Sequence, residues 1–236
     1  MRTDPRRRPV RPRFAVRAVA FDLDGTLLHT LPDIAVASDR MLRELGHPAA
    51  GEALVSGYIG NGIPRLVKRL LTGELRGEPA TGDFERALEA FMRHYRATFL
   101  ATPQPYPGVR EGLEHLRAAG LQLACVTNKA RAFTEPLLEA TGLARFFPLV
   151  LSGDSLPSKK PDPGPLLHVA RHFGIAPPQL LMVGDSDNDA RAARAAGCPV
   201  VCVAYGYRGG MALRELGCDA IVDDLLVLQR LVDAAA

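Results

Sequence analysis

The sequence lacks any apolar run that approaches the ~18 residues of a membrane-spanning helix. It shows no internal repeat, and no secretory hydrophobic region follows its N-terminal arginines, because the segment AVRAVAFDLDG is short and runs straight into charge. We therefore expect neither a membrane protein nor a secreted one. The 236 residues, 47% hydrophobic and 23% charged, suffice for one large globular domain or two small ones.

Cysteine is scarce as well. The four cysteines, Cys125, Cys198, Cys202 and Cys218, are far apart in the chain or on apparent strands. Cys198 and Cys202 are separated by three residues, which matches no recognised metal-ligand spacing. We therefore expect buried thiols rather than a disulfide framework, and a cytoplasmic location, where thiols stay reduced.

Positive charge is concentrated at one end of the chain. The formal net charge is +3, but residues 1–17 hold seven Arg and one Asp, so the remainder carries 22 basic and 25 acidic residues. We interpret residues 1–16 as a disordered, proline-interrupted basic extension. Such a segment is also typical of nucleic-acid or anionic-surface binding, so a nucleic-acid-associated protein stays open as an alternative.

Hydrophobic patterning predicts alternating strands and helices. Short apolar runs indicate six strands, at residues 15–23, 121–128, 146–154, 180–186, 198–206 and 219–224. Helical patterns lie between them, at residues 108–120, 131–142, 163–174, 187–197 and 210–217. We expect Pro136 to break the second of these helices early. The alternation predicts an α/β fold, with a Rossmann-like parallel sheet and helices on both faces.

One long segment interrupts this alternation. From Leu31 to about Thr102 the sequence shows helical patterns and no convincing strand. We therefore predict a helical cap domain over residues 31–102, inserted after the first strand. Residues 17–30 and 103–236 then form the α/β core domain, whose ligands should collect at the carboxyl ends of the parallel strands.

Polar side chains gather at those strand ends. They are Asp22 and Asp24 after the first strand, Thr127 and Asn128 after the second, Lys160 past the third, and Asp185 and Asp189 after the fourth. Two carboxylates ~4 Å apart repel by about 4 kcal/mol at an effective dielectric of about 20. A hard divalent cation with oxygen ligands removes this repulsion, and Mg²⁺ is the default choice. The pattern therefore predicts a metal site with a reaction beside it.

The motifs that carry these residues resemble those of the haloacid dehalogenase superfamily. DLDGT, VTN, KKPDP and GDSDND stand in the order of the four superfamily motifs, and the match extends from about Val16 to the C-terminus. The helical insert matches the cap of such enzymes. The segments YIGNGIPRLVKRLL, YPGVREGLEHLRAAG and AYGYRGGMALRELGCDAIVDD resemble, more narrowly, the phosphoglycolate phosphatase subfamily.

The resemblance implies a chemical role for each core motif. Asp22 would be the nucleophile, which attacks phosphorus and becomes an aspartyl-phosphate. Asp24 would be the general acid and base, protonating the leaving alcohol and then activating the hydrolytic water. Thr127 and Lys160 would bind the phosphoryl oxygens, helped by the backbone N–H of Asn128.

The resemblance also implies the metal ligands. Mg²⁺ would be bound by the Asp22 carboxylate, the Asp24 carbonyl and Asp185, while Asp189 would orient a metal-bound water or Lys160. An acid at position 24 favours phosphatase or phosphomutase chemistry, because the dehalogenases and phosphonatases of the superfamily have no acid there.

In the cap, Gly60 and Asn61 belong to a flexible GNG turn before a helix, whose N–H groups suit a small carboxylate. Arg65 follows on that helix and offers positive charge, although a solvated helix face accounts for it as well. We take Gly60, Asn61 and Arg65 as candidate substrate-binding residues. His29 stands where such enzymes often have Asp, and it either lines the hinge between core and cap or is exposed.

These features predict a Mg²⁺-dependent phosphatase for a small phosphate monoester, first of all 2-phosphoglycolate. A pyrophosphatase, a sugar-phosphate phosphatase and a phosphomutase are the alternatives within the superfamily. Nucleic-acid binding would leave the acids at the strand ends unexplained. We expect a small phosphorylated metabolite as partner and no membrane, with a monomer or a homodimer both open.

Overall fold

A six-stranded sheet forms the centre of the computed structural model, which describes residues 14–234. The strands are β2 Ala18–Phe21, β5 Gln122–Val126, β6 Leu149–Leu151, β7 Leu180–Gly184, β8 Val200–Val203 and β9 Ala220–Val222. Neighbouring strands are parallel, in the order β6-β5-β2-β7-β8-β9. All six predicted strands form, and the predicted parallel α/β sheet is confirmed.

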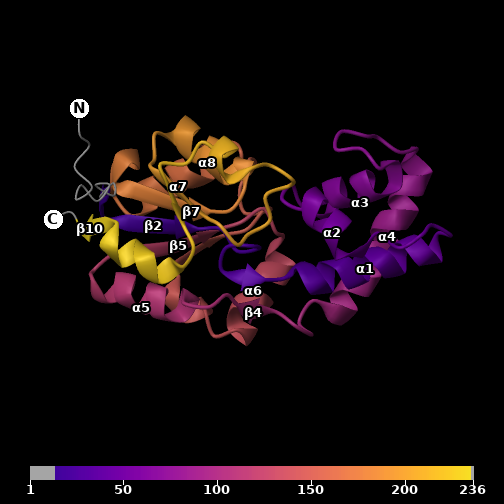
Figure 1. Ribbon diagram of the computed structural model, residues 1–236, viewed down its shortest axis with the longest axis horizontal. Coiled ribbons are helices and arrows are strands. Elements are labelled where there is room, and N and C mark those ends of the chain that lie inside the picture. The colour runs from indigo at the N-terminus through magenta and orange to yellow at the C-terminus, as the bar shows by residue number, and fades with distance from the viewer. Residues whose placement is uncertain (1–13, 235–236) are drawn as a thin grey trace, which may run out of the picture.

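Helices cover both faces of this sheet (Figure 1). They are α5 Val109–Ala118 and α6 Arg131–Ala140 on one face, and α7 Gly164–His172 and α8 Asp187–Ala196 on the other. In β2, Val19 and Phe21 pack into the first apolar core, whereas Ala18 and Ala20 pack into the second. Successive side chains of a strand point to opposite faces, so a strand covered on both sides must be apolar throughout.

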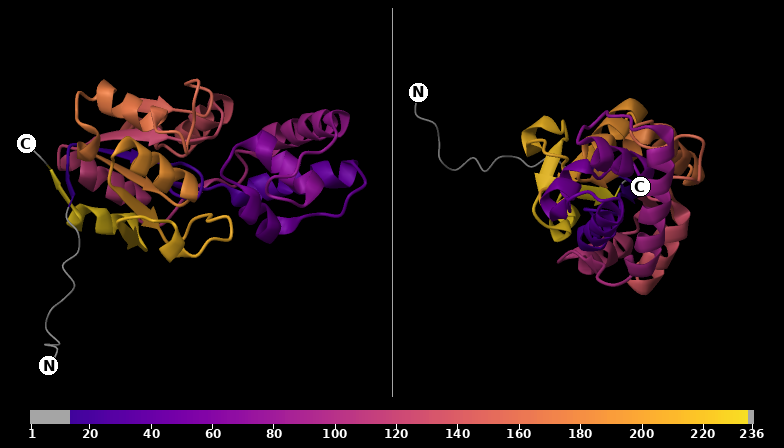
Figure 2. Two further views of the ribbon diagram at one scale, coloured as in Figure 1. Left: turned by 90° about the horizontal axis from the view of Figure 1, so that it is seen from above. Right: turned by 90° about the vertical axis from the view of Figure 1, so that its right-hand side faces the viewer.

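A helical cap is inserted between β3 (Leu28–His29) and β4 (Gln104–Pro105). Its helices are α1 Leu31–Glu44, α2 Gly51–Tyr58, α3 Ile63–Thr72 and α4 Thr81–Thr98. They share an apolar cluster of their own, in which Phe91 and Tyr95 of α4 are fully buried. β3 and β4 pair antiparallel, so both connections between the two lobes pass side by side (Figure 2). None of the described helices is long and apolar enough to cross a bilayer.

The N-terminal boundary differs from the prediction. We expected a disordered extension through residue 16, but Phe14–Val16 form strand β1, which pairs in parallel with β10 (Val232–Ala234). The remaining predicted extension, residues 1–13, lies outside the described residues. Short 3-10 helices complete the chain: η1 Ala144–Phe146, η2 Pro177–Gln179, η3 Leu213–Glu215 and η4 Leu225–Arg230.

Two helix predictions were wrong. Pro136 does not break α6, which continues to Ala140, because Phe133, Leu137 and Leu138 are buried on the side that faces the neighbouring cores. Tertiary packing there outweighs the local cost of proline. The helix predicted at residues 210–217 is only the turn η3. Leu216, which follows this turn, is buried, but η3 itself has no buried side chain to stabilise a longer helix.

Candidate active site

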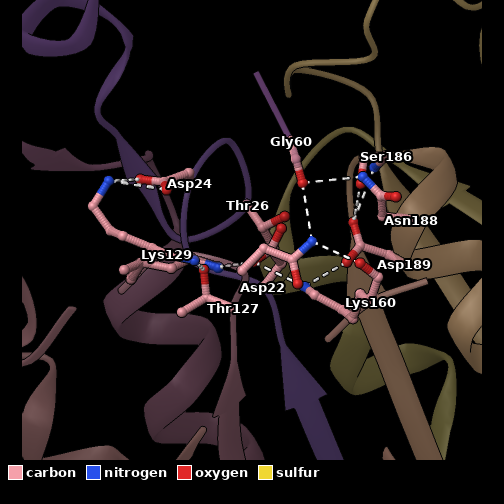
Figure 3. A network of polar contacts seen from close by, with 12 residues as sticks. Asp22, Asp24, Thr26, Gly60, Thr127, Lys129, Lys160, Ser186, Asn188 and Asp189 are labelled. Atoms are coloured by element: carbon pink, nitrogen blue, oxygen red, sulfur yellow. Dashed lines mark hydrogen bonds and ion pairs between the residues drawn. The ribbon is translucent and has the colours of Figure 1, made fainter. Parts of the chain in front are cut away.

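The residues that follow the three central strands form the candidate site. β2 lies between β5 and β7, and Asp22, Thr127 and Asp185 are the residues that directly follow these strands. Because the carboxyl ends of adjacent parallel strands meet at one edge, side chains far apart in sequence become neighbours. Figure 3 shows Asp22 and Thr127 close together at this edge, with Lys160 and Asp189 beside them.

Three carboxylates form an acidic cluster. Oxygen atoms of Asp22, Asp185 and Asp189 all lie within 4.8 Å of one another. Lys160 is buried beneath them, with Nζ 3.0 Å from Asp22 Oδ1 and 2.7 Å from Asp189 Oδ1. Burial alone lowers the pKa of Lys160, but Asp189 and Asp22 outweigh it and raise that pKa, so the lysine is a cation.

The cluster carries more negative charge than Lys160 balances. Burial, followed by the charges of Asp189 and Asp24, raises the pKa of Asp22 to about 7 against the opposing effect of Lys160. Burial and the charges of Asp22 and Asp189 likewise raise the pKa of Asp185 well above its usual range. Anionic oxygen donors with such an excess charge fit a hard divalent cation.

Asp189 differs from the other two acids because protein donors occupy both of its oxygens. Oδ1 accepts from Lys160, and Oδ2 accepts from the backbone N–H of Asp185 (3.2 Å), the backbone N–H of Ser186 (3.1 Å) and Ser186 Oγ (2.7 Å). The bond from the backbone N–H of Ser186 is part of the capping box that starts α8. Asp189 is therefore suited to holding Lys160 in place rather than to binding a ligand directly.

Asp185 is held by the turn that follows β2 and by the segment after β8. Thr26 Oγ1 donates to its Oδ1 at 3.0 Å, and the backbone N–H of Tyr207 donates to its Oδ2 at 2.5 Å. Gly25 makes this approach possible. It has a φ of +84°, and a Cβ there would lie 2.2 Å from Asp185 Oδ2, so the position requires glycine.

Asp24 lies apart from the acidic cluster and has its own cation. Thr30 Oγ1 donates to Asp24 Oδ1 at 2.6 Å, and Lys129 Nζ is 3.0 Å from both carboxylate oxygens. Lys129 is itself buried, and its Nζ lies 5.2 Å from the ring centroid of Tyr95. The two acids two residues apart in sequence are thus paired with two different lysines, Asp22 with Lys160 and Asp24 with Lys129.

A cavity of about 290 Å³ lies above these residues, between core and cap. Its core side includes Asp22, Asp24, Thr127, Asn128 and Asp185. Its cap side is mostly apolar and includes Ile34, Ile59, Ile63, Leu66, Leu88 and Met92. The cavity therefore encloses the candidate reacting groups under a hydrophobic lid, which suits a reaction that must exclude bulk water.

The cap rests on the core through the GNG turn. The carbonyl oxygen of Gly60 accepts from Asn128 Nδ2 at 3.0 Å. It also accepts from Asn188 Nδ2 at 3.1 Å (Figure 3). Asn61 Nδ2 donates to Asn188 Oδ1 at 3.1 Å. Asn128 Nδ2 also donates to the carbonyl of Lys160 at 2.8 Å. This arrangement is a closed cap with polar contacts across the lobes.

Two predicted substrate-binding residues, Asn61 and Arg65, do not line the cavity. Both border a neighbouring hollow beside α3, together with Lys159, and Arg65 forms an ion pair of 3.0 Å with Glu78. Gly60 borders the cavity itself. His29 lies at the hinge, with Nδ1 2.8 Å from Tyr207 Oη and 3.2 Å from Tyr106 Oη, so the hinge interpretation holds.

Four residues that support the site were not predicted from the sequence: Thr26, Lys129, Asn188 and Tyr207. Three of them, Thr26, Asn188 and Tyr207, belong to segments quoted for the resemblance, and Lys129 directly follows the VTN motif. Their partners lie between 105 and 159 positions away in the sequence, and Tyr207 is 22 positions from Asp185. Local pattern alone therefore gave no signal for their roles.

The chain matches the family model of haloacid dehalogenase-like hydrolases over residues 19–203 and belongs to this family. Among curated proteins, the phosphoglycolate phosphatase of Thiobacillus denitrificans is 53% identical over 210 residues, which are 89% of this chain and 92% of that one. The phosphoglycolate phosphatase of Nitrosospira multiformis is 53% identical over 221 residues, or 94% of this chain and 97% of that one.

A solved structure agrees with these relatives. The crystal structure of a predicted phosphoglycolate phosphatase from Haemophilus somnus superposes with a TM-score of 0.85 at 37% identity, covering 92% of this chain and 97% of that one. The resemblance inferred from the motifs is confirmed. This chain is a hydrolase that is similar over nearly its whole length to proteins named phosphoglycolate phosphatase.

Proposed function

We propose that this hydrolase is a Mg²⁺-dependent phosphatase that converts 2-phosphoglycolate to glycolate and phosphate. The observation that carries the proposal is the acidic cluster of Asp22, Asp185 and Asp189 around buried Lys160, beneath a cavity of about 290 Å³ between core and cap. Ligand pockets commonly span about 300–1,000 Å³, so a cavity at the low end favours a small substrate. The names of the curated relatives support the same substrate.

Asp22 is the nucleophile in this proposal. Its Oδ1 accepts from the backbone N–H of Leu23 at 2.7 Å and lies 3.0 Å from Lys160 Nζ. These two contacts fix the carboxylate plane, so we assign the attack on phosphorus to Oδ2. The new O–P bond forms as the bond from phosphorus to the ester oxygen breaks, which leaves an aspartyl-phosphate.

Asp24 is the general acid and base in this proposal. In the first step it donates its proton to the departing ester oxygen, so that glycolate leaves as an alcohol. In the second step its carboxylate takes a proton from the water that attacks the aspartyl-phosphate, which restores Asp22 and releases phosphate. Thr30 and Lys129 hold the carboxylate in one orientation for both steps.

Thr127, Asn128 and Lys160 would receive the phosphoryl group. Thr127 Oγ1 accepts from the backbone N–H of Lys129 at 3.1 Å, so its own hydrogen remains available for a phosphoryl oxygen. Asn128 lines the same cavity, and its backbone N–H would be the additional donor. Donors fixed before the reaction stabilise the charge that develops on the phosphoryl oxygens.

Mg²⁺ would be held by the carboxylates of Asp22 and Asp185 and by the Asp24 carbonyl. When bound, it would neutralise charge on the cluster and on the transferring phosphoryl group. Asp189 would remain in its present role, because its oxygens already accept from Lys160 and from the start of α8. We also place the enzyme in the cytoplasm, since the described cysteines are free thiols.

The test is phosphate release by the purified protein from 2-phosphoglycolate, pyrophosphate and hexose phosphates, with Mg²⁺ and with a chelator. We expect 2-phosphoglycolate to give the highest kcat/KM and chelation to abolish turnover. Asp22→Asn should remove phosphate release from every substrate. Metal-independent turnover, or full activity of Asp22→Asn, would overturn the mechanism, whereas a preference for pyrophosphate or a hexose phosphate would overturn only the substrate.

A further inference from the structure

One cation faces the active-site cavity from the core. Of the described residues that line the cavity, Lys129 alone has a basic side chain, because Lys160 lies beneath the acidic cluster. Lys129 Nζ contacts both oxygens of Asp24 at 3.0 Å. A lysine ammonium has three N–H donors, so one donor remains after these two contacts. Lys129 can therefore bind a second anion without leaving Asp24, in exchange for its interaction with the Tyr95 hydroxyl.

A buried hydroxyl faces the same cavity from the cap. Tyr95, on α4, is 1% exposed and lines the cavity; Lys129 is its polar neighbour and can only donate to Oη, so among the described residues the Tyr95 O–H has no acceptor. Burial raises the pKa of Tyr95, so the hydroxyl keeps its proton. A buried polar group without a partner costs about 1–3 kcal/mol. An acceptor supplied by a bound ligand would remove this cost.

The chemistry of the proposed substrate brings its carboxylate to these two residues. The ester oxygen must lie within hydrogen-bond reach of Asp24, and a single methylene separates that oxygen from the carboxyl carbon of 2-phosphoglycolate. Lys129 is the cation adjacent to Asp24, whereas Ile63, Leu66 and Met92 make the opposite wall apolar. A carboxylate against that apolar wall would be desolvated without compensation.

We propose that Lys129 and Tyr95 form the subsite that binds the carboxylate of the leaving group. This subsite makes the enzyme selective for phosphate esters of small hydroxy acids over phosphate esters of neutral alcohols. The inference rests on the proposed phosphatase function of the same cavity. It adds the two residues that distinguish the substrate class, one from the core and one from the cap.

The test compares two substrates of similar size, 2-phosphoglycolate and ethyl phosphate, in which a methyl group replaces the carboxylate. The measured quantity is the ratio of their kcat/KM values with saturating Mg²⁺. The wild-type enzyme should prefer 2-phosphoglycolate. Lys129→Met should lower the ratio by at least about 30-fold, because losing one partner of a buried charge pair costs 2 kcal/mol or more. Tyr95→Phe should lower it by about 5- to 10-fold.

A merely structural role predicts a different result. If Lys129 only orients Asp24, then Lys129→Met slows both substrates by the same factor, the ratio stays at the wild-type value, and the proposal is overturned. Lys68→Met is the matched control, because Lys68 pairs with Glu78 outside the cavity and its loss should leave the ratio unchanged. If Lys129→Met does not fold, Tyr95→Phe decides, since it removes a single oxygen: an unchanged ratio overturns the proposal.

Failure of this inference is distinguishable from failure of the proposed function. A wild-type enzyme that hydrolyses 2-phosphoglycolate and ethyl phosphate equally well remains a phosphatase, but it has no carboxylate subsite. A wild-type enzyme that releases no phosphate from 2-phosphoglycolate refutes the proposed substrate itself, and the subsite with it.

Discussion

The acidic cluster makes a prediction about stability that needs no catalytic assay. In the metal-free protein, burial disfavours ionised Asp22, and the negative charge of Asp189, whose carboxylate oxygen lies within 4.8 Å of that of Asp22, adds to this effect. Lys160, at 3.0 Å, offsets this only in part. Asp22→Asn keeps the shape of the side chain and removes its charge. We therefore expect the variant to be more stable than the wild type wherever Asp22 would be ionised.

The pKa of Asp22 gives the magnitude and the sign. Its pKa is raised from the ordinary 3.8 to about 7. The folded protein therefore binds more protons than the unfolded chain between these pH values, and the free energy of unfolding falls as pH rises through this window. Relative to low pH, where Asp22 is protonated in both states, the free energy of unfolding is lower by about 0.5 kcal/mol at pH 4 and by about 4 kcal/mol at pH 8. Asp185 titrates with Asp22 and adds to the effect in the same direction.

The assay is urea unfolding followed by circular dichroism, in a chelator, at pH 4 and pH 8. Asp22→Asn should unfold with nearly the wild-type free energy at pH 4 and a free energy several kcal/mol higher at pH 8. Adding Mg²⁺ at pH 8 should stabilise the wild type more than the variant, because binding to the folded state alone stabilises it. Asp83→Asn, an exposed acid paired with Arg86, is the control and should shift stability little at either pH. Equal stability of wild type and Asp22→Asn at pH 8 would refute the reasoning.

Three further substitutions test the site and its cap. Gly25→Ala should reduce kcat at least about 100-fold with little change in secondary structure, because its Cβ would lie 2.2 Å from Asp185 Oδ2; turnover near the wild-type rate would contradict this. Asn188→Ala removes a contact to the cap and should lower kcat/KM about 5- to 10-fold, and steady-state kinetics check it. Arg65→Ala should leave the KM for 2-phosphoglycolate unchanged, since Arg65 pairs with Glu78 outside the cavity; a raised KM would restore Arg65 as a substrate-binding residue.

The sheet and the core of the site were predictable for one physical reason. A parallel sheet covered on both faces needs strands that are apolar along their whole length, and such strands stand out as continuous runs. β2, with all four residues buried, is an example. Because these strands are parallel, the polar residues that follow them must converge. The positions of Asp22, Thr127 and Asp185 followed from sequence for that reason.

Contacts between the lobes were not predictable in the same way. The bond from Asn188 to Gly60 spans 128 positions, and the bond from Asn128 to Gly60 spans 68. No local pattern marks such pairs, which depend on how the cap packs on the core. For the same reason the sequence position of Arg65 predicted a substrate-binding residue. In the structure Arg65 borders a different hollow and does not line the cavity.

Two side chains connect the reacting groups to the cap. Asn128 donates both to the Gly60 carbonyl in the cap and to the Lys160 carbonyl beside Asp22. Tyr207 donates its backbone N–H to Asp185, while its hydroxyl accepts from the backbone N–H groups of Thr30 and Leu31, where the cap begins.

An opening movement of the cap must break or stretch the bond from Asn128 to Gly60 and the bonds from Thr30 and Leu31 to the Tyr207 hydroxyl, since these join the core to the cap or its start. The closed cap therefore does more than exclude water. It also holds Asn128 and Tyr207, the two residues that donate to the Lys160 carbonyl and to Asp185, so we expect cap closure to help position these groups.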